Sequence, residues 1–322
     1  MIPRPRVSFV FAAVLVLASL SGISAQQNAE KVLISIIKGP SGIASAWMMS
    51  DPPQSTGVEL RFVTAASADL VTAKLISGEI QGGVLPVNVA AKLFNAGVPI
   101  QALAVVGNGM VKFLSADPAI RQLVDIRGRD IHIAGQKATP DYIFRFLAEK
   151  EGLKAGQDYR AIYNLAYPEM AAQLAAGMID SAVLPEPFAT QALLLNSSIR
   201  EAIDLDALWK EKTGFDSYPM SLFVVSKALS IRQPQLVEAI GASYARSIEW
   251  TNADPAATAK LVETLDLGMK AQVALVAIPK SNYVYIKASR ARASIEALLS
   301  LFLVSDPQSI GGKLPSGAFY AQ

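Results

Sequence analysis

The sequence contains no cysteine and only one histidine among its 322 residues. Without cysteine the chain forms no disulfide bond and offers no thiol nucleophile, and one histidine is a poor basis for a structural zinc site. His132 falls within a predicted strand, where a histidine is more often packed than catalytic. We therefore expect a fold held by its apolar core, with no metal, no cofactor and no catalytic residue.

The sequence also has little excess charge. The 29 basic and 27 acidic residues leave a net charge of +2. Two of the basic residues, Arg4 and Arg6, lie at the very start, so 29 − 2 = 27 basic residues face 27 acidic ones in the remainder. This balance favours neither nucleic acid nor an anionic membrane as a partner.

A long apolar run is found at the start of the chain. Residues 7–20 are apolar for fourteen positions, which is too short to cross a bilayer as a helix. Basic residues precede this run, and the small residues 21–25 follow it. The pattern predicts a secretory signal peptide over residues 1–25 rather than a membrane anchor. Because neither a lipid-attachment cysteine nor an Arg-Arg pair is present, we expect general secretion of an unanchored protein to a periplasm.

Two stretches of the chain resemble each other. Residues 75–88 and 174–187 align without gaps and share Leu, Gly, Ile, Val, Leu and Pro at six of fourteen positions. Each reads as a helix end, a glycine turn and a buried strand that stops at Leu-Pro. This repeat indicates two α/β lobes with a ligand cleft between them, because open parallel sheets bind ligands beyond the carboxyl ends of their strands. Coincidence is the alternative, since this unit is common in α/β proteins.

The rest of the chain alternates between predicted strands and helices. We expect an α/β protein of two Rossmann-like lobes, in which lobe 2 (residues 116–219) is inserted into lobe 1 (residues 26–115 and 220–322). The chain is expected to cross between the lobes near Ser115 and Pro219, and Met220–Ser226 is predicted to be a strand that returns to lobe 1.

Several polar residues follow predicted strands or begin predicted helices. The loop Gly39-Pro40-Ser41-Gly42 opens a helix, whose unpaired N–H groups suit an anionic or polar ligand group. Asn88 and Thr139 are predicted N-caps, and Lys137 stands just before the second of these helices. An ordinary strand–helix turn, a simple cap and a solvated strand end are the alternatives for these positions.

Six stretches together resemble the type 2 periplasmic substrate-binding proteins of ATP-binding-cassette (ABC) importers, in particular the nitrate/sulfonate/taurine and thiamine-pyrimidine branch. The stretches are Gly39–Gly42, Leu75–Pro86, Asp125–Arg129, Gly135–Asp141, Val183–Ala189 and a closing segment, Asp306–Pro315. Their order covers nearly all of the chain beyond residue 25. Many relatives have a Gly/Ser-rich loop where this chain has Gln136-Lys137-Ala138-Thr139, so the ligand chemistry at that loop stays open.

The resemblance implies a Venus-flytrap fold, in which two lobes joined by two crossover strands close on a small ligand and dock on an ABC permease. It also implies a binding protein rather than an enzyme, and we expect a monomer. The ligand-binding residues predicted on this basis come from both lobes: Gly39, Ser41, Gly42, Pro86, Asn88 and Asn108 in lobe 1, and Lys137, Thr139, Tyr167, Glu186 and Tyr218 in lobe 2.

Lys137 is expected to hold an anionic or carbonyl oxygen, and Glu186 to accept from an N–H group or to pair with Lys137. Tyr167, Tyr218 and Phe188, together with Trp47, are candidates to wall a flat ring, although each aromatic residue is more often part of a core. A small acid, a sulfonate and a flat heterocycle all fit such a mixed set of residues.

Two other functions remain as alternatives. A periplasmic sensor would pass its ligand state to a receptor instead of a permease. Enzymes of similar fold are a weaker alternative: the deaminases that build tetrapyrroles anchor their cofactor on a cysteine, and thiamine-pyrimidine synthases use histidine chemistry and cysteine clusters. This chain has no cysteine, and no serine–histidine or paired-carboxylate arrangement stands out.

Overall fold

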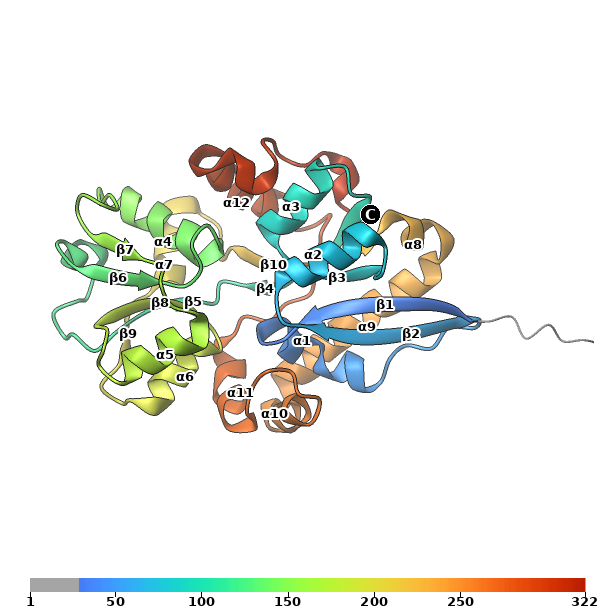
Figure 1. The fold of residues 1–322 in the computed structure, drawn as a ribbon, viewed down its shortest axis with the longest axis horizontal. Helices are drawn as coiled ribbons and strands as arrows, with labels where there is room; N and C mark the ends of the chain where they lie inside the picture. The colour runs from blue at the N-terminus through green and yellow to red at the C-terminus, as the bar shows by residue number, and fades with distance from the viewer. Residues whose placement is uncertain (1–28, 322) are drawn as a thin grey trace, which may run out of the picture.

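The computed structural model describes residues 29–321 and consists of two α/β lobes that lie side by side (Figure 1). The predicted signal peptide lies outside these residues. No helix within residues 29–321 combines the length and the apolar character needed to cross a membrane. The α/β class and the two-lobe architecture expected from the sequence are confirmed.

Each lobe is built around one mixed sheet. Lobe 1 has a six-stranded sheet in the order β11-β4-β10-β3-β1-β2, and lobe 2 has a five-stranded sheet in the order β7-β6-β8-β5-β9. The strands are β1 (Glu30–Ile37), β2 (Val58–Ala65), β3 (Gly82–Pro86), β4 (Ile100–Asn108), β5 (Val111–Ser115), β6 (Asp130–Ile133), β7 (Arg160–Ile162), β8 (Ser181–Pro185), β9 (Arg200–Ile203), β10 (Pro219–Ser226) and β11 (Ile286–Lys287).

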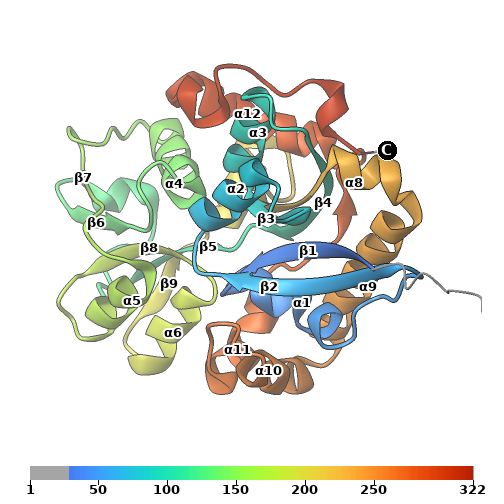
Figure 2. The same ribbon diagram turned by 45° about the vertical axis from the view of Figure 1, so that its right-hand side comes forward.

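Helices cover both faces of each sheet (Figures 1 and 2). They are α1 (Pro40–Ser50), α2 (Ala68–Ser77), α3 (Val87–Asn95), α4 (Thr139–Lys150), α5 (Tyr167–Ala175), α6 (Phe188–Leu195), α7 (Leu205–Thr213), α8 (Lys227–Arg232), α9 (Pro234–Ala253), α10 (Pro255–Thr264), α11 (Ala271–Ala277) and α12 (Arg292–Ser305), with short 3-10 turns at Leu123–Ile126, Ile278–Lys280, Pro307–Ile310 and Gly317–Phe319.

The internal repeat of the sequence occupies equivalent places in the two lobes. β3 pairs in parallel with β1 and antiparallel with β10, and β8 pairs in parallel with β6 and antiparallel with β5. Leu85 and Leu184 are fully buried at the ends of these strands. The prediction of two lobes built alike is confirmed, because both sheets place the Leu-Pro strand next to the strand by which the chain enters the lobe.

The chain passes from lobe 1 to lobe 2 earlier than the sequence indicated. We expected the boundary at Ser115, but Val111 pairs with Pro185 and Ser115 with Ser181 in the sheet of lobe 2. The crossing therefore falls at Gly109 and Met110, between β4 and β5. The second crossing precedes Pro219, which begins β10. β5 lies directly after the crossing, and its own residues do not indicate which of the two sheets it joins.

The two crossover segments contact each other. The Gly109 N–H donates to the Tyr218 carbonyl at 3.0 Å, and Asn108 pairs with Pro219. Gly109 has a φ of +39°, and a methyl group at its Cα would overlap Ser217 Oγ and lie 2.7 Å from Asp206 Oδ1. A glycine is required here because the second crossover packs directly against the backbone of the first.

Three apolar clusters fill the space between sheets and helices. One lies under α1, α9 and α10 of lobe 1, and one lies under α5 and α6 of lobe 2. The third includes α2, α3 and α12 of lobe 1 as well as α4 and α7 of lobe 2. This third cluster is continuous across the seam between the lobes, which places apolar side chains of both lobes in contact on one side of the molecule.

The close packing of α2 on β3 of lobe 1 can be tested at Gly83. A methyl group at Gly83 would lie 2.8 Å from the Ser35 carbonyl oxygen and 2.9 Å from Val71 Cγ1. We expect Gly83→Ala to lower the free energy of unfolding by about 1–3 kcal/mol, because the sheet and helix must move apart. Urea unfolding measures this change.

Gly317→Ala is the matched control for Gly83→Ala. The nearest atom to its added methyl group is Arg292 Nη1 at 3.6 Å, an ordinary contact distance. We expect an unfolding free energy within about 0.5 kcal/mol of the parent protein, as for most surface substitutions. Equal stability of the two variants would contradict the close packing at Gly83.

Candidate functional site

A cleft of about 620 Å³ lies between the lobes and is lined by residues of both. Its wall in lobe 1 includes the end of β1 and the end of β3, and its wall in lobe 2 includes the loop after β6 and the end of β8. Pro86 and Pro185, the prolines of the two Leu-Pro repeats, both line it. The cleft thus occupies the carboxyl edge of both sheets, where open α/β sheets bind ligands.

Six helices begin at this cleft. Their first or capping residues in the wall are Pro40 of α1, Ser67 of α2, Pro86 of α3, Ala138 of α4, Ala166 of α5 and Phe188 of α6. The N-terminus of a helix carries partial positive charge and N–H groups that have no partner within the helix. Helix ends from both lobes therefore direct donors at the same space.

Four of these six helix ends have no side-chain cap. The Ser67 hydroxyl accepts from the Leu70 N–H at the start of α2, and the Glu186 carboxylate accepts from the Thr190 N–H of α6 at 3.0 Å. Side-chain caps are absent from α1, α3, α4 and α5. Backbone N–H groups of these four helices are consequently donors that the cleft offers to a ligand, beside the hydroxyl groups of Thr139, Tyr167 and Ser221 in the wall.

The predicted residues Ser41, Pro86, Thr139 and Tyr167 all line the cleft. The Ser41 hydroxyl donates to the Ile37 carbonyl at 2.6 Å, which joins the end of β1 to the start of α1. Thr139 was expected to be an N-cap, but it is the first residue of α4 and Ala138 holds the cap position. Whether these four residues contact a ligand stays a prediction.

Two predicted glycines support the wall without lining it. Gly39 caps α1 with a φ of +101° and donates its N–H to the Leu267 carbonyl at 2.8 Å. A methyl group on Gly42 would lie 3.1 Å from Leu267 Cβ. These glycines allow the loop before α1 to pack against the chain that follows α10, and so they hold α1 in place.

The two predicted asparagines, Asn88 buried and Asn108 partly buried, lie close to the seam but do not line the cleft. Asn88 is the second residue of α3 rather than its N-cap, which is Pro86. Asn108 ends β4 at the first crossover. The Oδ1 atoms of both are buried without a hydrogen-bond partner among the described residues. Their contact with a ligand stays a prediction.

Lys137 also does not line the cleft. Its Nζ lies 3.2 Å from Asp306 Oδ2, and its side chain is 69% exposed. Asp306 follows α12 in lobe 1, so this ion pair joins the two lobes. The sequence analysis left open whether Lys137 pairs with Glu186; its partner in the structure is Asp306.

Glu186 was expected to face the cleft and is buried instead, with 1% of its surface exposed. Burial raises the pKa of its carboxyl group, and the hydrogen bonds from Thr190 oppose that shift. The carboxylate accepts from the N-terminus of α6, which is a favourable place for negative charge. Glu186 thus caps a helix of the wall.

The aromatic residues proposed as a ring wall separate into two groups. Tyr167 and Phe188 line the cleft and contact each other with ring centroids 5.5 Å apart. Tyr218 is fully buried against Trp209, with centroids 5.1 Å apart. Trp47 packs on Trp250 and donates to Thr258 at 2.8 Å, so it belongs to the helix layer of lobe 1.

The sequence analysis missed several lining residues, of which Met110, Met220 and Tyr163 are the largest. Met110 joins β4 to β5, and Met220 stands near the start of β10. Residues at a crossing between two lobes lie at the seam, so a correct placement of the first crossing would have indicated Met110, and Met220 adjoins the crossing expected near Pro219. Tyr163 follows the short strand β7, which has no comparable signal.

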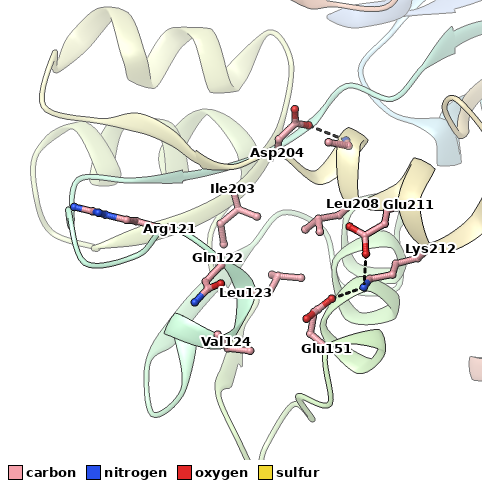
Figure 3. A pocket seen from close by; sticks show the side chains of 11 residues that line it. Arg121, Gln122, Leu123, Val124, Glu151, Ile203, Asp204, Leu208, Glu211 and Lys212 are labelled. Atoms are coloured by element: carbon pink, nitrogen blue, oxygen red, sulfur yellow. Dashed lines mark hydrogen bonds and ion pairs between the residues drawn. The ribbon is translucent and has the colours of Figure 1, made fainter.

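A second hollow, of about 480 Å³, is formed by residues of lobe 2 alone (Figure 3). Lys212 lies there between Glu151 and Glu211, with N–O distances of 2.6 and 2.8 Å. The charge of Lys212 is thus paired with the two glutamates, and no residue of lobe 1 lines this hollow. The cleft between the lobes is therefore the better candidate site.

Comparison with known proteins gives both a family and a fold. The family model described as the NMT1-like family matches residues 43–266. No curated protein matches the sequence. An ABC transporter structure from Parabacteroides distasonis is 25% identical over 90% of this chain and 98% of its own, with a TM-score of 0.78.

Two more distant structures share the fold. The periplasmic aliphatic sulphonate binding protein SsuA from Escherichia coli is 17% identical, with a TM-score of 0.73, over 91% of this chain and 92% of its own. The periplasmic nitrate-binding protein NrtA from Synechocystis PCC 6803 is 12% identical, with a TM-score of 0.62, over 87% of this chain and 84% of its own.

Glu186→Gln tests the environment of the buried carboxyl group. A raised pKa means that the folded protein binds more protons than the unfolded chain above the ordinary value of 4.5, so stability falls as pH rises through that window. Glutamine retains an acceptor for Thr190 and carries no charge. We expect the melting temperature of the variant, relative to the parent, to increase between about pH 4 and pH 7. Parallel pH profiles of the two proteins would contradict this.

Proposed function

The chain belongs to the NMT1-like family, and from this premise we propose that it is the solute-binding protein of an ABC importer. In this proposal it works outside the cytoplasmic membrane. It captures a small organic solute in the cleft between its lobes and delivers it to the permease in that membrane. The ABC transporter structure that is 25% identical to this chain, and is matched over 98% of its own length, supports this role. The expectation of a monomer is carried forward with the proposal.

The observation that carries the proposal is the set of helix N-termini at the seam. α1 and α3 of lobe 1 and α4 and α5 of lobe 2 begin at the cleft without side-chain caps. A ligand that accepts hydrogen bonds from both walls is bound more tightly when the lobes are together. Its binding free energy therefore favours the closed form over the open form.

We assign the ligand to organic solutes with a compact anionic or strongly accepting group and an apolar body. The N-termini supply donors for the first part. Apolar and aromatic side chains such as Met110, Leu165 and Phe188 surround the second part. Lys38 is the one Lys or Arg residue among the described residues of the wall, and its Nζ lies 2.5 Å from Asp266 Oδ2. The sulphonate and nitrate specificities of two structural neighbours agree with an anionic group.

The proposal includes no catalytic step. The described residues that line the cleft contain no histidine, aspartate or glutamate. General acid–base catalysis uses such groups most often. The wall is suited to holding a solute through backbone donors and apolar contacts.

A ligand screen by thermal shift tests the proposal directly. Small sulfonates, carboxylates and nitrate, with alkylammonium ions as the opposite charge, are the probes. We expect an anionic probe to stabilise the folded protein, by about 2.7 kcal/mol at a hundred times its dissociation constant. A response to alkylammonium ions and to no anion would contradict the proposed ligand class, and a response to no probe at all would contradict the proposed function.

Ala138→Asp tests the role of the helix ends. Ala138 is the uncapped N-cap residue of α4, lies in the wall and has an extended backbone. Aspartate there would cap α4 and raise the free energy of unfolding by about 1 kcal/mol. Since it would also occupy the donors and place negative charge in the cleft, we expect anion affinity to fall by about tenfold or more.

Ala138→Asn is the matched control, since asparagine caps equally well and carries no charge. Isothermal titration calorimetry of the parent and both variants separates the two effects. We expect a smaller loss of anion affinity for the asparagine variant. Undiminished affinity in the aspartate variant, with raised stability, would contradict binding at the start of α4.

A further inference from the structure

Helices of the two lobes meet along one rim of the cleft. α12 of lobe 1 contacts α4 of lobe 2, and Figure 1 shows α12 above the seam. The rings of Tyr142 and Phe302 lie 4.3 Å apart between their centroids, and both residues are buried. This apolar contact extends the core of lobe 1 into lobe 2.

Asp306 adds two polar contacts at the same place. It follows the last residue of α12, and its Oδ2 lies 3.2 Å from Lys137 Nζ and 3.2 Å from the Tyr142 hydroxyl oxygen. The hydrogen bond from Lys137 holds the pKa of the Asp306 carboxyl group below its ordinary range. One carboxylate of lobe 1 is thus bound by two donors of lobe 2.

The loop that carries Lys137 also forms part of the ligand wall. Lys137 has a φ of +59°, and its N–H donates to Asp141 Oδ2 at 2.8 Å. The other oxygen of Asp141 accepts from the Tyr163 hydroxyl group at 2.8 Å. Gly135 and Ala138, on either side of Lys137 in the same loop, line the cleft, and so does Tyr163. A chain of hydrogen bonds therefore connects Tyr163 in the ligand wall with the backbone of Lys137.

We propose that Asp306, with Lys137 and Tyr142, forms a latch that holds the lobes together and sets the residence time of the ligand without touching it. Because the partners belong to different lobes, opening of the cleft separates them, and the latch stabilises only the closed form. It gives Lys137 a positioning role in place of the ligand contact expected from the sequence. The inference rests on the proposed closing of the lobes on a solute.

Distance measurements on the ligand-free protein test the latch separately from ligand binding. The chain has no cysteine, so Gln157→Cys in lobe 2 and Ala228→Cys in lobe 1, both at exposed positions, accept spin labels specifically. We expect Asp306→Asn to shift the distribution of distances between the labels towards the open form. An unchanged distribution would overturn the latch, whichever solute the protein binds.

Dissociation kinetics supply the second readout, with butanesulfonate as the probe. We expect Asp306→Asn to raise the dissociation rate constant by about fivefold, the effect of one partly exposed charged contact. Tyr142→Phe, which deletes a single hydroxyl group, is expected to have a smaller effect in the same direction. An unchanged rate constant in both variants would overturn the latch.

Asp130→Asn serves as the control, because Asp130 pairs with Arg160 inside lobe 2. We expect it to leave the distances and the rate constant unchanged, and an effect equal to that of Asp306→Asn would overturn the latch. If butanesulfonate does not bind the parent protein while the label distances shift as expected, the latch stands and the proposed ligand class fails.

Discussion

The carboxyl ends of the parallel strands in two mixed sheets face each other in this protein, and the arrangement of the site depends on that constraint. A strand that ends at this edge is followed by a helix whose N-terminus points back towards it. Two such sheets, joined edge to edge, bring helix N-termini from both sides to one cleft. The donors there are backbone groups, so their positions are set by the fold and little by side-chain type.

The crossings between the lobes make this arrangement movable. Gly109 packs against the second crossover, and its N–H bonds to the Tyr218 carbonyl, so the two connecting segments form one unit. Rotation about such a short unit changes the separation of the walls while each sheet stays intact. Near the cleft, Asp306 of lobe 1 meets Lys137 and Tyr142 of lobe 2, which are the contacts of the proposed latch.

The pattern of the sequence was sufficient to predict the two-lobe architecture and part of the wall of the cleft. The Leu-Pro repeat predicted two similar lobes and placed Pro86 beside the cleft, because a buried strand that ends at proline can only end at the sheet edge. The helix-opening loops predicted Ser41 and Thr139 in the wall for the same local reason. The partners of other predicted site residues were not foreseen: Lys137 pairs with Asp306 of the other lobe, Glu186 accepts from the Thr190 N–H, and Tyr218 packs on Trp209.

What the sequence by itself determined is the succession of strands, turns and helix starts, since hydrophobic period, glycine and proline act over a few residues. Only the tertiary structure decided where the chain changes lobes and which polar groups face solvent, core or cleft. Glu186 directly follows β8 and Asn88 comes two residues after β3, yet both are buried beside the cleft rather than in its wall. Burial and pairing arise from the packing of distant segments, and no local pattern encodes them.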